Sequence, residues 1–107
     1  MFARIISMRL KPNAAAEFSH TIEKKILPTL RKQKGFRDEI TFIASGGMEA
    51  VGISLWDSRE QADAYNSGSY PDEVLRELNR VVEGTPSVQT YDVANSTAHK
   101  IAARPAA

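Results

Sequence analysis

The sequence predicts an α+β domain in which four strands form one antiparallel sheet, in the order strand, helix, strand, strand, helix pair, strand. Three observations predict this order. A long amphipathic pattern at residues 14–34 follows the first apolar stretch. The turn-forming Ser45-Gly46-Gly47 joins the next two apolar stretches as a hairpin. A junction rich in aromatic residues at 55–65 then starts a second helical stretch, and an apolar stretch at residues 87–94 closes the domain.

The first half of the chain is predicted to form a strand and one long helix. Residues 2–10 are rich in Ile, Phe, Met and Leu and stop at Lys11-Pro12-Asn13, which predicts a strand and a break. From Ala14 to Lys34 the apolar residues recur at steps of three and four, as in an amphipathic helix. Pro28 removes one helical donor and bends the helix at a cost of about 3 kcal/mol unless packing offsets it. Gly35 then supplies a left-handed helix end.

The second half supplies the hairpin, the helix pair and the last strand. Residues 37–44 and about 49–56 are the predicted second and third strands. Asp57 follows as an N-cap, with Glu60 at the spacing of a capping box. This short helix fades at residues 66–68, and Pro71 opens a further helical run that residues 84–86 end. Ser87 to Ala94 is the fourth strand, which completes a ferredoxin-like βαββαβ arrangement with its helices on one face.

Length and composition indicate one domain at residues 1–95 and a flexible C-terminal tail at residues 96–107. The 14 Lys and Arg residues balance the 13 Asp and Glu residues, and the scattered basic positions do not indicate nucleic-acid binding. Cysteine is absent, which excludes disulfides and thiolate chemistry and favours a cytoplasmic location. Arginines interrupt the first apolar stretch, so we expect no signal peptide and no membrane span.

The alternation of apolar residues predicts that both faces of the sheet are covered. In the third strand Val51, Ile53 and Leu55 oppose Trp56, and in the first strand Ile5 lies opposite the other apolar residues. A single layer of helices covers only one face of a sheet. We therefore expect a second copy of the chain to cover the other face, in a homodimer with two-fold symmetry.

Several motifs resemble the antibiotic-biosynthesis-monooxygenase superfamily over about residues 2–95. They include a strand that ends in Trp56, the helix start at residues 57–60, Ala64-Tyr65 near the helix end, and the restart at residues 69–71. The segments at residues 27–30, 34–36 and 86–93 agree as well. The resemblance implies a dimeric α+β barrel. It also implies a cofactor-independent monooxygenase-like activity, without metal, flavin or haem, on a small phenolic or quinol compound.

The sequence departs from two groups of this superfamily. Haem-degrading members use an asparagine, a tryptophan and a histidine where this chain has Ser7, Tyr65 and no histidine, which argues against haem. Oxygenase members commonly carry histidines just after the position of Tyr65, and none stands here. A non-catalytic dimeric module that binds a small ligand or serves in assembly therefore remains an alternative.

The candidate site gathers around the aromatic junction. Tyr65, Asn66 and Tyr70 are the candidate catalytic residues, because hydroxyl and amide groups can orient a substrate oxygen and stabilise a phenolate. The candidate substrate-binding residues are Trp56, as an apolar wall, and Ser7 and Ser54, as hydrogen-bonding groups of the sheet. The ligand is expected to be small and hydrophobic or aromatic.

The alternative role of these tyrosines is structural: Tyr65 would close the short helix on the core, and Tyr70 would anchor the loop. Arg4 and Arg9 either steer an acidic substrate or lie on the surface. His20 is expected on a solvated helix face and His99 in the tail, so no metal site is predicted.

Overall fold

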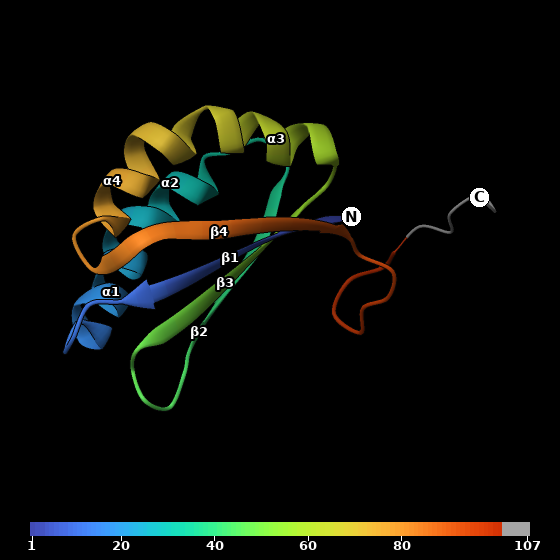
Figure 1. The fold of residues 1–107 in the computed structure, drawn as a ribbon. Coiled ribbons are helices and arrows are strands. Elements are labelled where there is room, and N and C mark those ends of the chain that lie inside the picture. Colours follow the sequence, from blue (N-terminus) through green and yellow to red (C-terminus); the bar gives the residue numbers. More distant parts are fainter. Residues whose placement is uncertain (102–107) are drawn as a thin grey trace.

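The computed structural model describes residues 1–101, and residues 102–107 of the predicted tail lie outside the described residues. The strands are β1 (Phe2–Leu10), β2 (Phe36–Ile43), β3 (Glu49–Trp56) and β4 (Val82–Asp92). The first helical stretch contains α1 (Ala15–Thr21), the π-helical turn η1 (Ile22–Ile26) and α2 (Leu27–Arg31). The second contains α3 (Arg59–Ser67), the π-helical turn η2 (Tyr70–Val74) and α4 (Leu75–Leu78). Figure 1 shows their arrangement.

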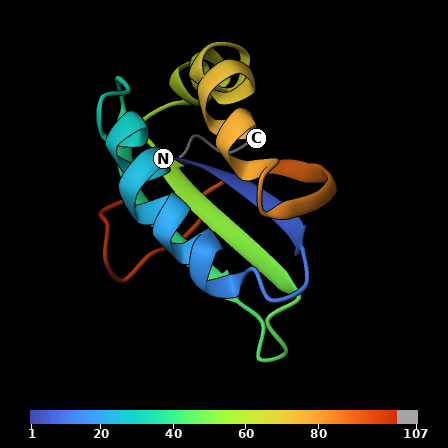
Figure 2. The same ribbon diagram turned by 90° about the vertical axis from the view of Figure 1, so that its left-hand side faces the viewer.

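The four strands form one antiparallel sheet in the order β2-β3-β1-β4. Both helical stretches lie on one face of this sheet, as Figures 1 and 2 show together. The predicted ferredoxin-like α+β fold is therefore confirmed. Strands β3 and β1 are the two central strands of the sheet. Their side chains on the helix-covered face therefore lie in the middle of the space between the sheet and the helices.

The first helical stretch adapts to Pro28 through a π-helical turn. Leu27 donates its backbone N–H to the carbonyl of Ile22, five residues back, and Pro28 lies in the first turn of α2. A proline lacks the N–H that an inner helical position would need, and a first turn is where this loss is tolerated. The stretch was predicted to run to Lys34, but α2 ends at Arg31 with Lys32 as a right-handed C-cap. Gly35 has the predicted positive φ, 82°, in the turn that follows.

Two boundaries in the second half differ from the prediction. The N-cap of α3 is Ser58 and not Asp57: the Ser58 hydroxyl accepts a hydrogen bond from the backbone N–H of Gln61 at 3.3 Å. Strand β4 begins at Val82, five residues before the predicted Ser87, because Val82 pairs with Leu10 of β1. Gly84, which was predicted to help end a helix, has a φ of 70° and lies inside β4, where the pairing with β1 shifts register.

The core lies between the helices and the inner face of the sheet. Its largest fully buried side chains are Trp56 from β3, Phe18 from α1, Leu10 from β1 and Val81 from the turn before β4. On β1, every second residue from Phe2 to Leu10 is buried. This alternation fixes which side chains of β1 face the helices.

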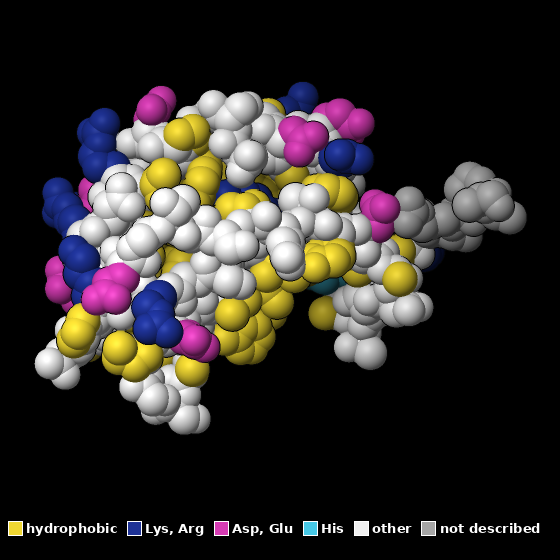
Figure 3. All heavy atoms as spheres, viewed as in Figure 1, with side chains coloured by type: hydrophobic (Ala, Val, Ile, Leu, Met, Phe, Trp, Pro, Cys, Tyr) yellow, Lys and Arg dark blue, Asp and Glu magenta, His cyan; other side chains and the backbone are white. Residues whose placement is uncertain are grey.

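The outer face of the sheet carries apolar side chains that no helix covers. Ile40 and Phe42 of β2 and Tyr91 of β4 are about half exposed, at 53%, 52% and 50%. Ile40 pairs with Ile53, and Phe42 with Val51, across the β2–β3 ladder. In Figure 3, hydrophobic side chains gather below the strands, between the β2–β3 hairpin and the C-terminal segment. The predicted presence of apolar residues on both faces is confirmed.

Candidate functional site

A cavity lies between the inner face of the sheet and the helical stretches. It holds about 400 Å³ of empty space, part of it open to solvent. Most of its lining is aliphatic, and its polar lining consists of Arg4, Glu39, Thr41, Ser54, Tyr65 and Tyr70. An apolar cavity with a few convergent polar groups is typical of a site for a small organic ligand.

Arg4 is the most unusual residue of this cavity. Its side chain leaves β1 on the inner face, and the residue is only 3% exposed. The Nε and Nη2 atoms donate to the Oδ1 atom of Asn66 at 3.2 and 3.1 Å. Within residues 1–101 no carboxylate oxygen lies within 4.0 Å of the guanidinium group. A buried charge without a counter-ion is costly, which makes Arg4 a candidate for binding an anionic ligand.

Two tyrosine rings hold the Arg4 cation. The guanidinium carbon lies 4.1 Å from the ring centre of Tyr70 and 5.2 Å from that of Tyr65. These are distances of cation–π interactions, and in a desolvated site such a contact contributes about 2 kcal/mol. The aromatic rings thus stabilise the positive charge without neutralising it.

Trp56 stands behind Tyr65 and fixes its ring. The two rings stack with centres 5.1 Å apart and planes 29° apart, while Phe36 contacts the indole edge-on at 5.6 Å. The indole Nε1 donates to the Ser54 hydroxyl at 2.9 Å, and this hydroxyl donates to the carbonyl of Arg4 at 3.4 Å. These two hydrogen bonds connect the buried indole of Trp56, through Ser54, to the backbone of Arg4 on β1.

Glu39 faces the cavity from β2 because of a β-bulge. Phe36 pairs with Trp56, and Asp38 pairs with Leu55, so Arg37 is the extra residue of the bulge. Glu39 and Thr41 therefore point inward, and the Thr41 hydroxyl donates to Glu39 Oε2 at 2.7 Å. This arrangement places a carboxylate in the same cavity as the Arg4 cation.

The cavity shifts the proton affinity of two lining groups. Burial raises the pKa of the Glu39 carboxyl above its usual value, and the Thr41 hydrogen bond opposes this shift. Burial also raises the pKa of Tyr65 far above its usual value, although the Arg4 charge lowers it. Tyr65 is therefore a neutral hydroxyl at physiological pH, able to donate a hydrogen bond to a ligand.

The structure brings most of the sequence-predicted site residues together. Tyr65, Tyr70 and Ser54 line the cavity. Asn66 and Trp56 do not line the cavity themselves but contact residues that do. Asn66 accepts hydrogen bonds from the Arg4 side chain, and Trp56 stacks on Tyr65.

Ser7 is the exception among the candidate substrate-binding residues. It alternates with Arg4 and Ile6 on β1 and is exposed on the outer face, where it pairs with Val51. It does not line the cavity, because a residue one or three positions from an inward-facing residue points outward in a strand.

Two cavity residues were missed by the sequence reasoning. Arg4 is predicted from the sequence to steer an acidic substrate or to lie on the surface, but it shares the spacing of the apolar Phe2 and Ile6 and lies on the same buried face. Glu39 was not singled out, because regular alternation from Phe36 places it on the opposite face. Only the bulge at Arg37 turns Glu39 inward, and the sequence carries no clear signal of that bulge.

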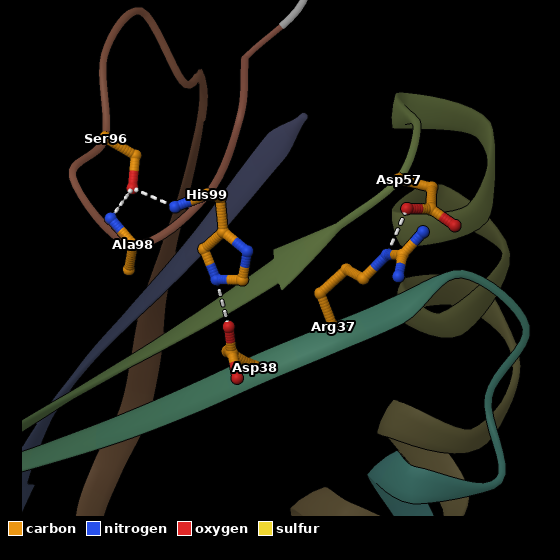
Figure 4. A network of polar contacts seen from close by, with 6 residues as sticks. All are labelled: Arg37, Asp38, Asp57, Ser96, Ala98 and His99. Carbon is orange, nitrogen blue, oxygen red and sulfur yellow. Dashed lines mark hydrogen bonds and ion pairs between the residues drawn. The ribbon is translucent and has the colours of Figure 1, made fainter.

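A second polar cluster lies where the C-terminal segment approaches β2, away from this cavity. His99 contacts the carboxylate of Asp38, and Arg37 contacts that of Asp57 (Figure 4). His99 was expected to lie free in the tail, but the structure places it against β2. These contacts satisfy the charges within the cluster, so it offers fewer free groups than the cavity.

Residues 1–101 contain neither a candidate metal site nor a helix that could span a membrane. The described residues contain no cluster of three or more His, Cys, Asp or Glu side chains that could hold a metal ion. Within the same residues, none of the helices has the length and apolar character needed to span a membrane.

Comparison with known proteins establishes the fold. No family model and no curated protein sequence matches the chain. Solved structures do: SnoaB, a cofactor-independent oxygenase from Streptomyces nogalater, superposes with a TM-score of 0.73 at 12% identity, covering 92% of this chain and 97% of its own.

Two further structures agree. A monooxygenase from the gene ActVA-Orf6 of Streptomyces coelicolor, in complex with nanaomycin D, gives a TM-score of 0.72 at 14% identity, with 89% and 88% of the two chains covered. Rv0793 from Mycobacterium tuberculosis gives 0.68 at 20% identity, with 90% and 97% covered. The resemblance predicted from the sequence is thus confirmed for the fold, which these proteins share with this chain.

Proposed function

We propose that this chain is a member of the antibiotic-biosynthesis-monooxygenase superfamily and a cofactor-independent monooxygenase-like protein acting on a small phenolic or quinol compound. One observation carries the proposal: the buried Arg4 cation has no carboxylate partner within residues 1–101 and lies in an apolar cavity between two tyrosine rings. The fold shared with a cofactor-independent oxygenase and with a monooxygenase that binds nanaomycin D supports it.

The chemistry of such a substrate matches the residues of the cavity. A phenol becomes electron-rich enough to react with oxygen when it loses its proton, and a buried cation lowers the pKa of a bound phenol. Arg4 stabilises the phenolate, while the hydroxyls of Tyr65 and Tyr70 orient its oxygen. Asn66 positions Arg4, and Trp56 and Ser54 hold Tyr65 and the strands in place.

The overall reaction balances without a further reductant. A phenol and one molecule of oxygen give a quinone and water: one oxygen atom replaces a ring hydrogen as a carbonyl, and the other leaves as water. The substrate itself supplies the electrons that reduce this second oxygen atom. The protein then has to bind, deprotonate and orient the substrate and to exclude bulk water.

We also propose that two copies of the chain pack through the outer faces of their sheets. Ile40, Phe42 and Tyr91 are half exposed there, next to Val51 and Ile53. A monomer rarely leaves a contiguous apolar face of this kind in water. The occupant that fits best is the same face of a second copy, because a two-fold contact is self-complementary.

The test of the activity is oxygen uptake by the purified protein with a panel of hydroquinones and naphthols. We expect uptake with at least one of them. Tyr65→Phe and Tyr70→Phe each remove one hydroxyl from the cavity, and Tyr91→Phe is the matched control on the outer face. Uptake that both cavity variants leave unchanged contradicts the hydroxyl roles, and no uptake across a broad panel contradicts the enzymatic function.

A binding module without catalysis is the second candidate, favoured by the largely aliphatic lining of the cavity and by the absence of a histidine just after Tyr65. Calorimetric titration of the same compounds distinguishes the two functions. Saturable binding without oxygen uptake supports the module, and binding with uptake supports the enzyme.

A further inference from the structure

Arg4 and Glu39 lie on the same face of the sheet, on either side of Ser54. Arg4 pairs with Ser54 across the β1–β3 ladder, and Glu39 pairs with Ser54 across the β2–β3 ladder. Since neighbouring strands lie about 4.8 Å apart, the two backbone positions are about 10 Å apart. Both side chains line the cavity, yet they are not within ion-pair distance of each other. The space between them is thus flanked by a cation and a carboxylate.

Each of the two charged groups keeps one polar atom without a partner among residues 1–101. Asn66 takes the Nε and Nη2 atoms of Arg4, so Nη1 remains. Thr41 binds the Oε2 atom of Glu39, so Oε1 remains. The two residues are held in place by one neighbour each and retain a donor and an acceptor for a ligand.

We infer that Glu39 and Arg4 form a proton-transfer site for the hydroxyl group of an aromatic ligand. Glu39 accepts the hydroxyl proton, and Arg4 donates a hydrogen bond to the oxyanion that remains. The ligand O–H bond breaks with its electron pair left on the ligand oxygen, and a new O–H bond forms on a Glu39 oxygen. The inference rests on the proposed function, for which it names a general base and an oxyanion-binding group.

The surroundings of Glu39 favour this role. Its carboxyl pKa is raised mainly by burial, which brings it closer to neutral pH, where a general base is most effective. The other titratable groups that line the cavity are Arg4 on β1, Tyr65 on α3 and Tyr70 on η2. The first helical stretch contributes only the aliphatic Ile22, Ile26 and Leu30, and the second adds Val74 and Leu78. Glu73 on η2 acts on Tyr65 by raising its pKa.

The experiment measures the ionisation of bound 4-nitrophenol, whose phenolate absorbs at longer wavelength than the phenol. The absorbance of the protein-bound compound is recorded against pH for the full chain and its variants. For the wild type we expect the ionisation midpoint to fall by about one pH unit or more relative to free 4-nitrophenol, because Arg4 favours the anion.

The two charged residues have opposite effects on this midpoint. Arg4→Gln is expected to raise it back toward that of the free compound, while Arg4→Lys keeps most of the shift. Glu39→Gln is expected to lower it further, because a negative charge beside the hydroxyl is removed. Arg9→Gln and Glu49→Gln, on exposed positions of β1 and β3, are matched controls that leave the midpoint unchanged. Circular dichroism confirms that each variant is folded.

A second arm tests the base in turnover. Where oxygen uptake is present, Glu39→Gln is expected to lower kcat/KM by roughly 10²- to 10⁴-fold and to abolish the acidic limb of its pH profile, with partial rescue by Glu39→Asp.

The ionisation of bound 4-nitrophenol is measured without turnover. It therefore tests the inference independently of whether the protein consumes oxygen. No binding of 4-nitrophenol, or a midpoint that neither Arg4→Gln nor Glu39→Gln moves, overturns the inference. Retained uptake with an unaltered acidic limb in Glu39→Gln overturns the role of the base.

Discussion

The Arg4 guanidinium lies over the ring of Tyr70, with its carbon 4.1 Å from the ring centre. A ring face attracts a cation without removing its charge, in contrast to a carboxylate. The positive charge therefore remains available to an anion that enters the cavity. We therefore expect the Arg4 charge to serve ligand binding and to contribute little to the stability of the fold.

We expect Arg4→Met to keep the protein folded and to remove ligand binding. The loss of the cation–π contacts is offset by burying an apolar side chain in place of a charge, so the free energy of unfolding should change by less than about 1.5 kcal/mol. Urea unfolding followed by circular dichroism measures this change. A loss of about 3 kcal/mol or more would assign Arg4 a structural role instead.

The raised pKa of Glu39 predicts a pH-dependent effect of Glu39→Gln on stability. In the folded state the protonated carboxyl is favoured, so the folded protein binds more protons than the unfolded chain as pH rises above the ordinary glutamate value. The wild type consequently loses stability over that interval, up to the folded-state pKa, and Glu39→Gln does not. We expect the variant to gain stability relative to the wild type as pH rises from 4 to 7.

Urea unfolding of both proteins across this pH range, with Glu49→Gln as the exposed control, measures the difference. A constant difference between the wild type and Glu39→Gln at all pH values would contradict the burial of an ionisable Glu39 carboxyl.

Gly35 and Gln61 are predicted to couple strongly. A Cβ atom at Gly35 would lie 1.9 Å from the Gln61 Oε1 atom, and Gly35 has a φ of 82°. Gly35→Ala should therefore cost more than the roughly 1 to 2 kcal/mol that a left-handed conformation costs an L-residue. The Gln61→Ala background removes the clash and also the buried Oε1 atom, which has no hydrogen-bond partner among residues 1–101.

A double-mutant cycle on the free energy of unfolding measures this coupling. We expect Gly35→Ala to be less costly in the Gln61→Ala background, with only the backbone strain left. Additive effects of the two substitutions would show that Gln61 moves away without cost.

The proposed dimer predicts that charge on the outer face separates the subunits. Sedimentation at micromolar concentration should give a dimer for the wild type and a monomer for Ile40→Glu, because the substitution buries a carboxylate in the apolar contact. Met48→Glu, in the β2–β3 turn at 41% exposure, is the matched control and should remain dimeric. A well-folded single chain in the wild-type sample would contradict the packing of two sheets.

The fold was predictable because its signals are local and repeated. Strands β1 and β3 and the Ser45-Gly46-Gly47 turn follow from alternation and turn chemistry, and the positive φ of Gly35 follows from its place after a helical pattern. The cap of α3 was missed because Asp57 and Ser58 are both good N-cap residues. In the structure the Asp57 carboxylate contacts Arg37 of β2, and the Ser58 hydroxyl caps the helix.

The site was predictable only in part because its geometry depends on pairing between strands. The aromatic junction placed Tyr65, Tyr70 and Trp56 correctly near one another. Glu39 reaches the cavity through an extra residue at Arg37, and a one-residue shift moves every later side chain of the strand to the other face. Such a shift depends on how β2 pairs with β3, and the sequence of β2 alone does not indicate it.

The contact between Trp56 and Tyr65 also gives the protein a built-in optical reporter. Trp56 is the only tryptophan of the chain, and its indole stacks directly on a ring that lines the cavity. Its emission therefore comes from one site, and a quinone or phenol that displaces or contacts Tyr65 alters the surroundings of the indole. Intrinsic fluorescence thus follows occupancy of the cavity without any label.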